Sequence, residues 1–564
     1  MGLKMMGGVL GASGALGGLF YYYAMQEDEA LKRAMQDPSV ALEPPPPEFV
    51  HPYIEKPWWW RMLFAIRRAI YVAYVFLPVA GVGVLSAYIF PESEVWRQRF
   101  LTALIRAMEK AGCCFMKLGQ WISMRPDMFS RDIVKTMASL RDGVPEHPFK
   151  FTEESIRQSF KKEISDIFEY FEDTPIASGT VAQVYRARLK PEYAIHGTIQ
   201  DVAVKVRHPN ILNETFLDLD LIFGFVDSCF PEKYSMPCSQ DELTHILRQQ
   251  LDLKWEAYNL YKFSTNFRHE LQSGLVHFPQ VSKELCSDSV LVESWVEGAT
   301  IATVFSDIEG GEDHTWSSSK TLSDNFSEAV MAKKKQLARV IFDMNVKMFL
   351  RDNYVHGDMH AGNLIVSMED GRVTVIDAGL ITSLKPDVAN PFGDFLRALC
   401  NSDVDTIVDK ILEFNVGKVA VDEVAFRRKI EEITDHFKTK EAAGGGDGGE
   451  KETGVDGSGK KNEGRYALGD VVGEILLNLQ KFKIVLRGDV AASIMTISVS
   501  EGLILQLDPE FDMVRQALPF FVRYKGWSTA EAVMRGGGSK TKAQSSSASS
   551  ETAVAAATPS AVPA

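Results

Sequence analysis

The spacing of hydrophobic and polar residues changes several times along the chain, and each change marks a different kind of element. From residue 94 to about 149, apolar residues recur every three to four positions, which predicts amphipathic helices. Short apolar alternations between turn residues over 168–206 predict a small β-sheet. Helical spacing returns over 210–267, a strand pattern follows at 290–296, and a further helix is predicted over 333–351. This order predicts an α+β fold in which a small sheet lies between helical regions.

The segment from residue 69 to 90 carries no charge and is long enough to cross a bilayer as one helix. Three tryptophans at 58–60, followed by Arg67 and Arg68, precede it, where side chains that anchor a helix at a membrane interface are expected. We therefore predict a transmembrane helix over 69–90. The pattern leaves a helix buried in the protein core open as the alternative.

Two segments have compositions that cannot form a packed core. Residues 441–464 are rich in glycine and charged side chains and predict a disordered insertion. Residues 536–564 are rich in Ser, Ala and Thr and predict a disordered tail.

The composition argues against nucleic-acid binding, a disulfide-rich fold and a cysteine-bound zinc site. The 564 residues include 61 Lys and Arg against 75 Asp and Glu, a formal net charge of −14. No clustered basic stretch appears, so the balance argues against nucleic acid as a partner. Six cysteines without a Cys-x-x-Cys spacing predict free thiols rather than a disulfide framework or a zinc site.

The densest chemical signal is a pair of short strands, each followed by a carboxylate, within residues 354–379. Asp358, the amide Asn363 five residues on, and Asp377 occur in the order that protein kinases use for a catalytic base and two magnesium ligands. Magnesium prefers a few hard oxygen ligands from protein and takes the remainder from phosphate and water. The spacing therefore predicts a site for a magnesium-bound phosphate compound.

That hypothesis requires three further features upstream, and the chain offers a candidate for each. Lys205 lies in the apolar strand pattern 202–206 and could reach phosphate groups. Glu256, in a helical pattern, could pair with this lysine. Between two earlier strands lies a loop of small residues whose backbone N–H groups could approach phosphate oxygens; it comprises Ala177, Ser178, Gly179, Thr180, Val181 and Ala182.

A second hypothesis uses part of the same segment. His356, Asp358 and His360 alternate, so in a strand they would share one face and could bind zinc or iron. This hypothesis, a metal-dependent hydrolase, leaves Asn363 and Asp377 unexplained.

Together these features resemble the UbiB/aarF-type atypical kinase-like family, and within it the mitochondrial aarF-domain-containing kinase 2 branch. Residues 115–121 are similar to the family's Lys-x-Gly-Gln signature, and residues 123–129 match its continuation. Residues 377–379 read Asp-Ala-Gly, as in that branch, where the common sequence is Asp-Phe-Gly. The resemblance covers about residues 95–525 and extends through 501–509 near the C-terminus.

The resemblance implies a bilobal kinase-like fold with a role for each matching residue. Lys205 would bind nucleotide phosphates and pair with Glu256, the loop 177–182 would cover the nucleotide, and Asp358 would occupy the position of the catalytic base. ATP or ADP and Mg²⁺ are the implied cofactors, with Asn363 and Asp377 as metal ligands. A helical extension would fold over the active site, with Lys117 meeting Asp252; its signature residues are Lys117, Gly119 and Gln120.

The resemblance also suggests how the chain is divided. Residues 1–95 would form a membrane-associated region, 96–150 the helical extension, 151–298 the smaller lobe and 299–535 the larger lobe.

Some positions depart from the family pattern. Gly357 stands where alanine is usual, Gln250 where glutamate is frequent, and Gly179 interrupts the small-residue loop, which could alter the preference for one nucleotide. No Ala-Pro-Glu sequence follows Asp377, so a platform for a protein substrate is not expected.

The expected function is phosphoryl transfer or ATP hydrolysis at a membrane, in coenzyme Q or lipid metabolism. Its partners would be lipids, quinone-like molecules or proteins of that biosynthesis. The alternative is a catalytically weak nucleotide-binding scaffold. The family implies a mitochondrial inner membrane, with a plastid membrane as the alternative location.

Overall fold

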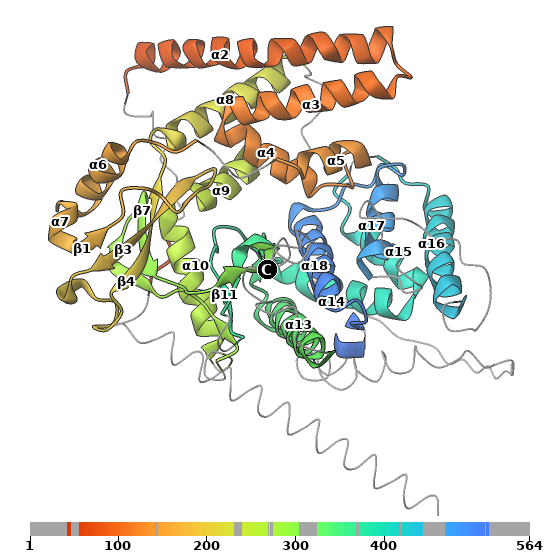
Figure 1. Ribbon diagram of the computed structural model, residues 1–564. Helices are drawn as coiled ribbons and strands as arrows, with labels where there is room; N and C mark the ends of the chain where they lie inside the picture. The colour runs from red at the N-terminus through yellow and green to blue at the C-terminus, as the bar shows by residue number, and fades with distance from the viewer. Residues whose placement is uncertain are drawn as a thin grey trace, which may run out of the picture.

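The computed structural model describes residues 42–46, 56–140, 145–229, 240–268, 274–303, 324–367, 371–417, 419–443 and 468–513, with positions 270, 515–517 and 520. Figure 1 shows a sheet with flanking helices on one side, a group of helices on the other, and a layer of helices across the top. Most of the predicted insertion 441–464 and all of the predicted tail 536–564 lie outside the described residues. Helix α16 continues to Ala443, so the predicted insertion began three residues too early.

The smaller lobe contains an antiparallel sheet in the order β1-β3-β4-β7-β6, with β2 paired to β3. Its strands are β1 (Phe168–Phe171), β2 (Ala177–Ser178), β3 (Ala182–Leu189), β4 (Asp201–Arg207), β6 (Val281–Cys286) and β7 (Val290–Ser294). One face packs against α6 (Phe149–Phe160) and α7 (Ile164–Ile167), where Val202, Val204 and Val206 join a buried cluster with Ile156. The alternate residues of β4, including Lys205, therefore face the other side, where α10 (Leu253–Asn266) packs on Leu291.

The larger lobe is mainly helical, and two small sheets lie at its junction with the smaller lobe. One sheet has the order β5-β11-β10-β8 and the other pairs β12 with β9. The strands are β5 (Val276–His277), β8 (Ala299–Thr300), β9 (Val355–His356), β10 (Leu364–Val366), β11 (Val373–Val375) and β12 (Ile381–Thr382). The helices are α13 (Asp324–Lys347), α14 (Pro386–Asn401), α15 (Val404–Glu413), α16 (Glu423–Ala443), α17 (Leu468–Leu479) and α18 (Gly488–Leu507). These helices enclose two apolar clusters, one of them shared with β9, β10 and β11.

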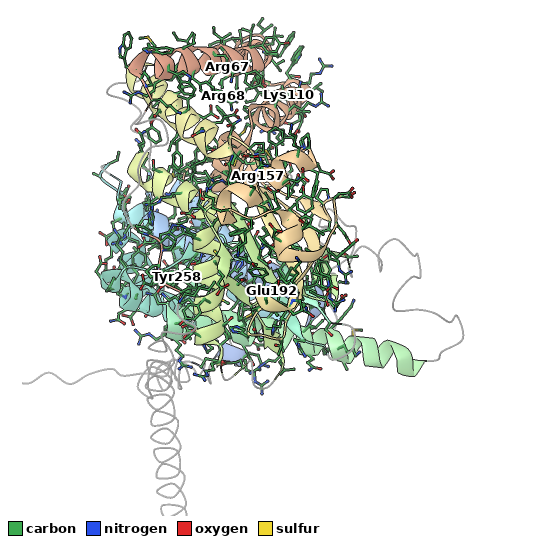
Figure 2. The ribbon with its side chains drawn as sticks, turned by 90° about the vertical axis from the view of Figure 1, so that its left-hand side faces the viewer. Arg67, Arg68, Lys110, Arg157, Glu192 and Tyr258 are labelled. Carbon is green, nitrogen blue, oxygen red and sulfur yellow. The ribbon has the colours of Figure 1, made fainter. Side chains whose placement is uncertain are left out.

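The layer of helices above both lobes is built from the N-terminal half of the chain. Its members are α2 (Trp58–Val84), α3 (Glu94–Ala111), α4 (Cys113–Ser123), α5 (Arg131–Met137), α8 (Ile211–Cys229) and α9 (Gln240–Leu251). Helices α2 and α3 run side by side at the top of Figure 1. Arg68 joins α2 to α8, because its guanidinium donates two hydrogen bonds of 2.7 Å to Asp218 and a third to the carbonyl of Ala111. Figure 2 shows Arg67, Arg68 and Lys110 together at this end of the molecule.

The fold confirms the predicted α+β class, with a small sheet between helical regions. Within the described residues, two helices are long and apolar enough to span a membrane: α2 with its continuation to Ile89, and α18. The most apolar stretch of helix α18 is more than half buried, as in a core helix, whereas only 11% of the most apolar stretch of α2 and its continuation is buried. The predicted segment 69–90 is therefore largely helical and exposed, and its crossing of a membrane stays a prediction.

Candidate active site

Lys205 is the centre of a buried ionic cluster between the lobes. It forms an ion pair with Glu256 on α10 and a second one, of 3.1 Å, with Oε1 of Glu293 on β7. It also donates a 2.9 Å hydrogen bond to the backbone carbonyl of Ile376, the residue before Asp377. The three side chains Lys205, Glu256 and Glu293 are only 12%, 9% and 4% exposed. All three N–H groups of the ammonium therefore have an acceptor, and the lysine joins both lobes.

The cluster contains two acidic side chains and one cation. Burial raises the pKa of Glu256 to about 8, although the nearby Lys205 opposes this shift. Burial also raises the pKa of Glu293, again against the attraction of Lys205. Burial acts to lower the pKa of Lys205, but the charges of Glu256, Glu293 and Asp377 outweigh it and raise that pKa. Lys205 is therefore a fixed cation, and Glu293 is a second acidic partner that the sequence analysis did not include.

Glu293 is the site residue that sequence reasoning missed. The signal was a single acidic residue inside the apolar stretch 290–296, in a strand whose five residues are all buried. A buried carboxylate in a strand requires a partner, and the neighbouring strand β4 supplies Lys205.

Asp358, Asn363 and Asp377 are brought together by the short strands of the larger lobe. Strand β9 leads to Asp358, and a single 3-10 turn ends at Asn363 before β10 begins. Strands β10 and β11 pair antiparallel, and the N–H of Ile376 donates to the carbonyl of Asn363. The Asn363 amide nitrogen donates a 2.9 Å hydrogen bond to the carbonyl of Asp358. That orientation leaves its oxygen, Oδ1, as the amide atom that can face a cation.

His356 positions this segment rather than binding a metal. Its Nδ1 accepts a hydrogen bond from the N–H of Asp358, so its Nε2 carries the proton and donates to the carbonyl of Asp377. Burial lowers the pKa of His356, which keeps the ring neutral. Nδ1 of His360 likewise accepts from the N–H of Gly362. Among the described residues no three His, Cys, Asp or Glu side chains are grouped as a metal site would require, so the geometry does not favour the zinc or iron hypothesis.

Asp377 remains ionised in the cleft. Desolvation acts to raise its pKa, but Lys205, the N–H of Gly379, His356 and Lys117 together lower it. Its Oδ1 accepts a 3.0 Å hydrogen bond from Gly379, while the side chain as a whole stays open to solvent. The Asp377 carboxylate and the Asn363 amide oxygen lie on neighbouring turns and fit Mg²⁺, which binds through few protein oxygens.

The extension helix α4 contributes a positive charge to the cleft. The charge of Lys117 lowers the pKa of Asp377, whereas the charges acting on Asp252 are those of Asp288, Lys254 and Arg207. No contact between Lys117 and Asp252 is found among the described ion pairs, because Asp252 caps α10 and accepts a hydrogen bond from the N–H of Lys254. The structure therefore does not bring Lys117 and Asp252 together as an ion pair, and it places Lys117 close enough to Asp377 for their charges to interact.

Two further residues of the signature lie on α4. A Cβ atom at Gly119 would lie 2.2 Å from a methyl carbon of Leu140 and 2.9 Å from Cε of Met108, so glycine lets α4 approach its neighbours closely. Gln120 is half-buried on the next position of the helix.

Residues 123–129 tie the extension to the larger lobe, a contact that sequence reasoning did not anticipate. The guanidinium of Arg125 donates two hydrogen bonds, of 2.9 and 2.8 Å, to the carboxylate of Asp127, and both side chains are buried. Arg125 also donates to the carbonyl of Leu486, and the N–H of Leu486 donates to Asp127. The extension is therefore anchored to the larger lobe as well as to the helices of its own layer.

The small-residue loop forms a tight hairpin turn between β2 and β3. The N–H of Gly179 donates to the carbonyl of Ala182 at 2.9 Å, and the ring Nε2 of His208 lies 3.0 Å from the carbonyl of Gly179. Among the loop residues Thr180 is buried and Ala177 is exposed. The position of the loop, beside the strand that precedes Lys205, is the one that the sequence predicts.

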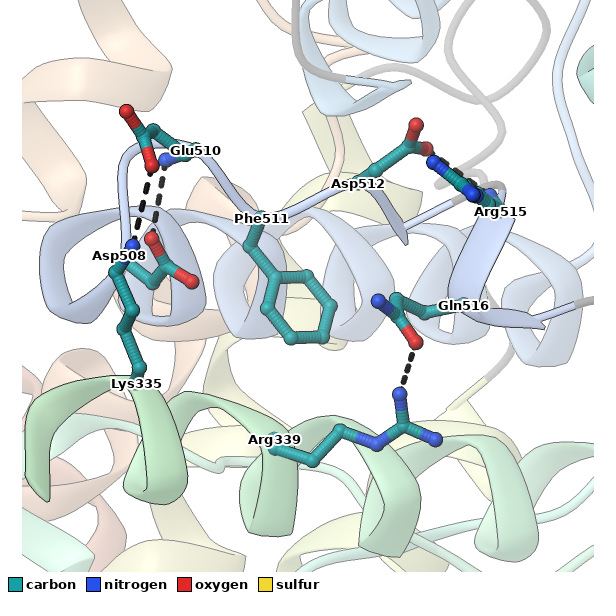
Figure 3. Close-up of a pocket in the computed structure, with 8 residues that line it drawn as sticks. All are labelled: Lys335, Arg339, Asp508, Glu510, Phe511, Asp512, Arg515 and Gln516. Carbon is teal, nitrogen blue, oxygen red and sulfur yellow. Dashed lines mark hydrogen bonds and ion pairs between the residues drawn. The ribbon is translucent and has the colours of Figure 1, made fainter. Parts of the chain in front are cut away.

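A cavity of about 490 Å³ lies elsewhere, between α13 and the segment after α18 (Figure 3). Lys335 and Arg339 line it, but Lys335 pairs with Glu510 at 3.1 Å and Arg339 with Asp343 at 2.8 Å. Since these charges are already compensated and the surface is exposed, we assign the chemistry to the cleft around Lys205.

The geometry of a lysine–glutamate pair across from an Asp, Asn and Asp set is that of a kinase-like cleft. The family model described as the ABC1 atypical kinase-like domain matches residues 139–411. The chain contains an ABC1 atypical kinase-like domain. This finding confirms the resemblance to the UbiB/aarF-type family and the bilobal kinase-like fold.

Three relatives agree with this assignment. An ABC1 family protein of Saccharomyces cerevisiae, named as mitochondrial, is 25% identical over 78% of this chain and 70% of its own length. A probable serine/threonine-protein kinase of Dictyostelium discoideum is 34% identical over 49% of this chain and 36% of its own length. The probable protein kinase UbiB of Shewanella piezotolerans is 25% identical over 76% of this chain and 71% of its own length.

Proposed function

We propose that this ABC1 domain binds a magnesium-bound adenine nucleotide, ATP or ADP, in the cleft around Lys205, and that it catalyses phosphoryl transfer from ATP. The single observation that carries the proposal is the contact of Lys205 with Glu256, Glu293 and the carbonyl next to Asp377. Phosphoryl transfer depends mainly on positioning and on neutralising charge, and this cluster supplies both.

Each residue has a role that its surroundings support. Lys205 would contact phosphate oxygens. This contact would replace its hydrogen bond to the Ile376 carbonyl, because a neutral carbonyl is a weaker acceptor than the two carboxylates. Asp377 and Asn363 would hold Mg²⁺, whose positive charge would offset the charge of the phosphates. Asp358 is exposed to the cleft, and its backbone is fixed by His356 and Asn363, so it can accept a proton from an attacking hydroxyl or water.

We infer that the acceptor is water or a small molecule rather than a protein. Helix α4 brings the charge of Lys117 to Asp377, and Arg125 fastens the end of that helix to the larger lobe. A protein substrate would have to displace this anchored helix. A hydroxyl-bearing lipid or quinone-like molecule is smaller, and the UbiB name of a relative supports the proposal of a role in ubiquinone biosynthesis.

The competing proposal is a nucleotide-binding scaffold with little turnover. Asp358→Asn distinguishes the two, because the change should abolish ATP turnover and leave nucleotide binding nearly unchanged. Turnover is measured as phosphate or ADP release, and binding as the rise in melting temperature with Mg-ATP. Asp394→Asn on α14 is the matched control, since the half-exposed Asp394 forms an ion pair with Arg397 and lies outside the proposed site. Equal turnover by wild type and Asp358→Asn would contradict the enzymatic proposal.

We also propose that the outer face of α2 contacts a membrane. Its exposed side chains include Leu63, Ile70, Tyr74 and Leu77, each at least 64% exposed, and the cationic Arg67 lies on the same helix. The opposite side of α2 packs against α3, which carries exposed arginines, so this pair favours attachment along the surface. The relative named as mitochondrial supports a mitochondrial membrane.

Vesicle flotation tests this membrane proposal. The full chain should float with anionic vesicles, and replacing Ile70, Tyr74 and Leu77 by serine should reduce the floating fraction severalfold. Val424→Ser is the control, because this valine is 71% exposed on α16, away from α2. Extraction of cell membranes with carbonate separates the two modes, since a surface-bound helix is released and a spanning helix is retained.

A further inference from the structure

Glu293 has one oxygen that the ionic cluster does not use. Its Oε1 pairs with Lys205, whereas its Oε2 is buried and has no hydrogen-bond partner among the described residues. The side chain is 4% exposed, so water does not replace the missing partner freely. A buried carboxylate oxygen without a donor is destabilising, and a ligand that offers an N–H group would relieve this cost.

The sheet register shows where Glu293 lies in the cleft. Strands β4 and β7 are antiparallel, with Ala203 opposite Glu293 and Lys205 opposite Leu291. Directly opposite residues share a sheet face, so Glu293 and Ala203 face the same side as Lys205. Ala203 has a single methyl group as its side chain, so the neighbour of Glu293 on this face is small.

The chain path gives the direction of a bound nucleotide. Strand β7 ends at Ser294, and residues 295–298 lead directly into β8 of the larger lobe. Gly298 has a φ of +145°, and a Cβ there would lie 2.4 Å from the carbonyl of Val366, so this connection is pressed against β10. This connection joins the two lobes at the end near Glu293, whereas Asp358 and Asp377 lie exposed to solvent. A nucleotide with its phosphates at Lys205 and Asp377 would place its base towards Glu293.

We propose that Glu293 selects the base of the bound nucleotide, its Oε2 accepting a hydrogen bond from the exocyclic amine of adenine. This inference rests on the proposed nucleotide-binding function. With Oε1 held by Lys205, a single acceptor remains, which suits the one exocyclic amine of adenine. Inosine carries a carbonyl at the same ring position. This carbonyl and Oε2 of Glu293 would be two hydrogen-bond acceptors facing each other, so inosine nucleotides should bind more weakly.

Three nucleotides test the proposal: ATP, inosine triphosphate, and purine riboside triphosphate, which lacks the amine. Binding of each with Mg²⁺ is measured by calorimetry or thermal shift. Wild type should bind ATP roughly tenfold or more tightly than the purine riboside triphosphate, as expected for a hydrogen bond to a charged group. Discrimination against inosine triphosphate should be larger still.

Two variants of Glu293 and one control complete the design. Glu293→Gln keeps an acceptor for Lys205 and places an N–H₂ group where Oε2 was, so the preference should shift from ATP towards inosine triphosphate. Glu293→Leu should bring the ratio of ATP to purine riboside triphosphate affinity close to one. Glu297→Gln, four residues along and with a side chain 78% exposed, should keep the wild-type ratios.

The outcomes separate this proposal from the one on which it rests. Binding of Mg-nucleotides with the same base preference in wild type, Glu293→Gln and Glu293→Leu would overturn the role of Glu293 and leave nucleotide binding intact. Failure of folded wild-type protein to bind any of the nucleotides would overturn both. A folded Glu293→Gln variant, verified by its melting curve, with reversed preference for ATP and inosine triphosphate would support the assignment.

Discussion

Replacement of Lys205 by methionine should destabilise the protein as well as weaken nucleotide binding. In the wild-type cluster one ammonium faces Glu256, Glu293 and Asp377. Methionine fills a similar volume but leaves the two buried glutamates without a cation. Removing one partner from a buried ion pair typically costs about 3–5 kcal/mol, a large part of the roughly 5–15 kcal/mol by which a domain is stable.

The stability lost on replacing Lys205 by methionine should depend on pH, and the direction of this dependence follows from the pKa of Glu256. The pKa of Glu256 is about 8 in the folded wild type against 4.5 for the ordinary side chain, and loss of Lys205 should raise the folded value further. Between these two values the folded state binds more protons than the unfolded state, so stability falls as pH rises. The destabilisation by Lys205→Met should therefore be small near pH 5, where Glu256 is protonated, and largest above pH 8, where Glu256 is ionised.

Urea denaturation at pH 5, 7 and 8.5 measures this effect. Lys205→Met/Glu256→Gln removes one of the uncompensated carboxylates and should recover about half of the loss at pH 8.5. Lys283→Met, an exposed lysine on β6, is the control and should change stability little at any pH. A Lys205→Met protein as stable as wild type at pH 8.5 would refute the idea of a charge-balanced cluster. Binding of Mg-ATP should be weak in both Lys205 variants, which separates the phosphate role from the structural one.

Two further predictions concern the surroundings of the cleft. Gly119→Ala should lower stability by about 1–3 kcal/mol, measured by urea denaturation, because its Cβ would lie 2.2 Å from Leu140 and α4 would have to move; an unchanged stability would contradict the close packing. Burial, and then the charge of His208, lowers the pKa of His147 to about 4, against an ordinary value of 6.5. The unfolded state then binds more protons between pH 6.5 and 4, so stability is lost as pH falls through this range. The loss at pH 5 has a ceiling of about 2 kcal/mol, or about 1 kcal/mol after allowance for solvent screening at this half-exposed ring, and it should disappear in His147→Gln.

The residues that could be predicted from sequence are those whose spacing along the chain reflects the chemistry. Asp358, Asn363 and Asp377 lie within twenty residues and are brought together by two adjacent short strands, so local pattern was sufficient. Lys205 and Glu256 are 51 positions apart, and their pairing followed only from the order of features in a kinase-like chain.

Contacts that depend on packing between segments distant in the sequence could not be predicted from local spacing. Lys117 acts on Asp377 rather than on Asp252, since Asp252 is engaged by the N–H of Lys254 at the start of α10. The attachment of Arg125 to Leu486 joins segments 361 positions apart and has no local signal in the sequence. Asn259 is similar: its amide donates to the carbonyl of Ala378, a contact that the helical position alone does not reveal.

The charge balance of the cleft bears on whether the proposed nucleotide would bind with or without its metal ion. Around Asp377 the described cations are Lys205 and Lys117, and the acidic side chains of Glu256 and Glu293 lie beside Lys205. A free triphosphate entering this site would meet carboxylates that are only partly compensated by two lysines, and Coulomb repulsion is strong where water is excluded. In the proposed site, a divalent cation held by Asn363 and Asp377 would supply the positive charge that offsets this repulsion. Lys205 is already shared by three acceptors, so it cannot supply the missing positive charge alone. The arrangement of residues therefore favours the metal-bound nucleotide over the free one.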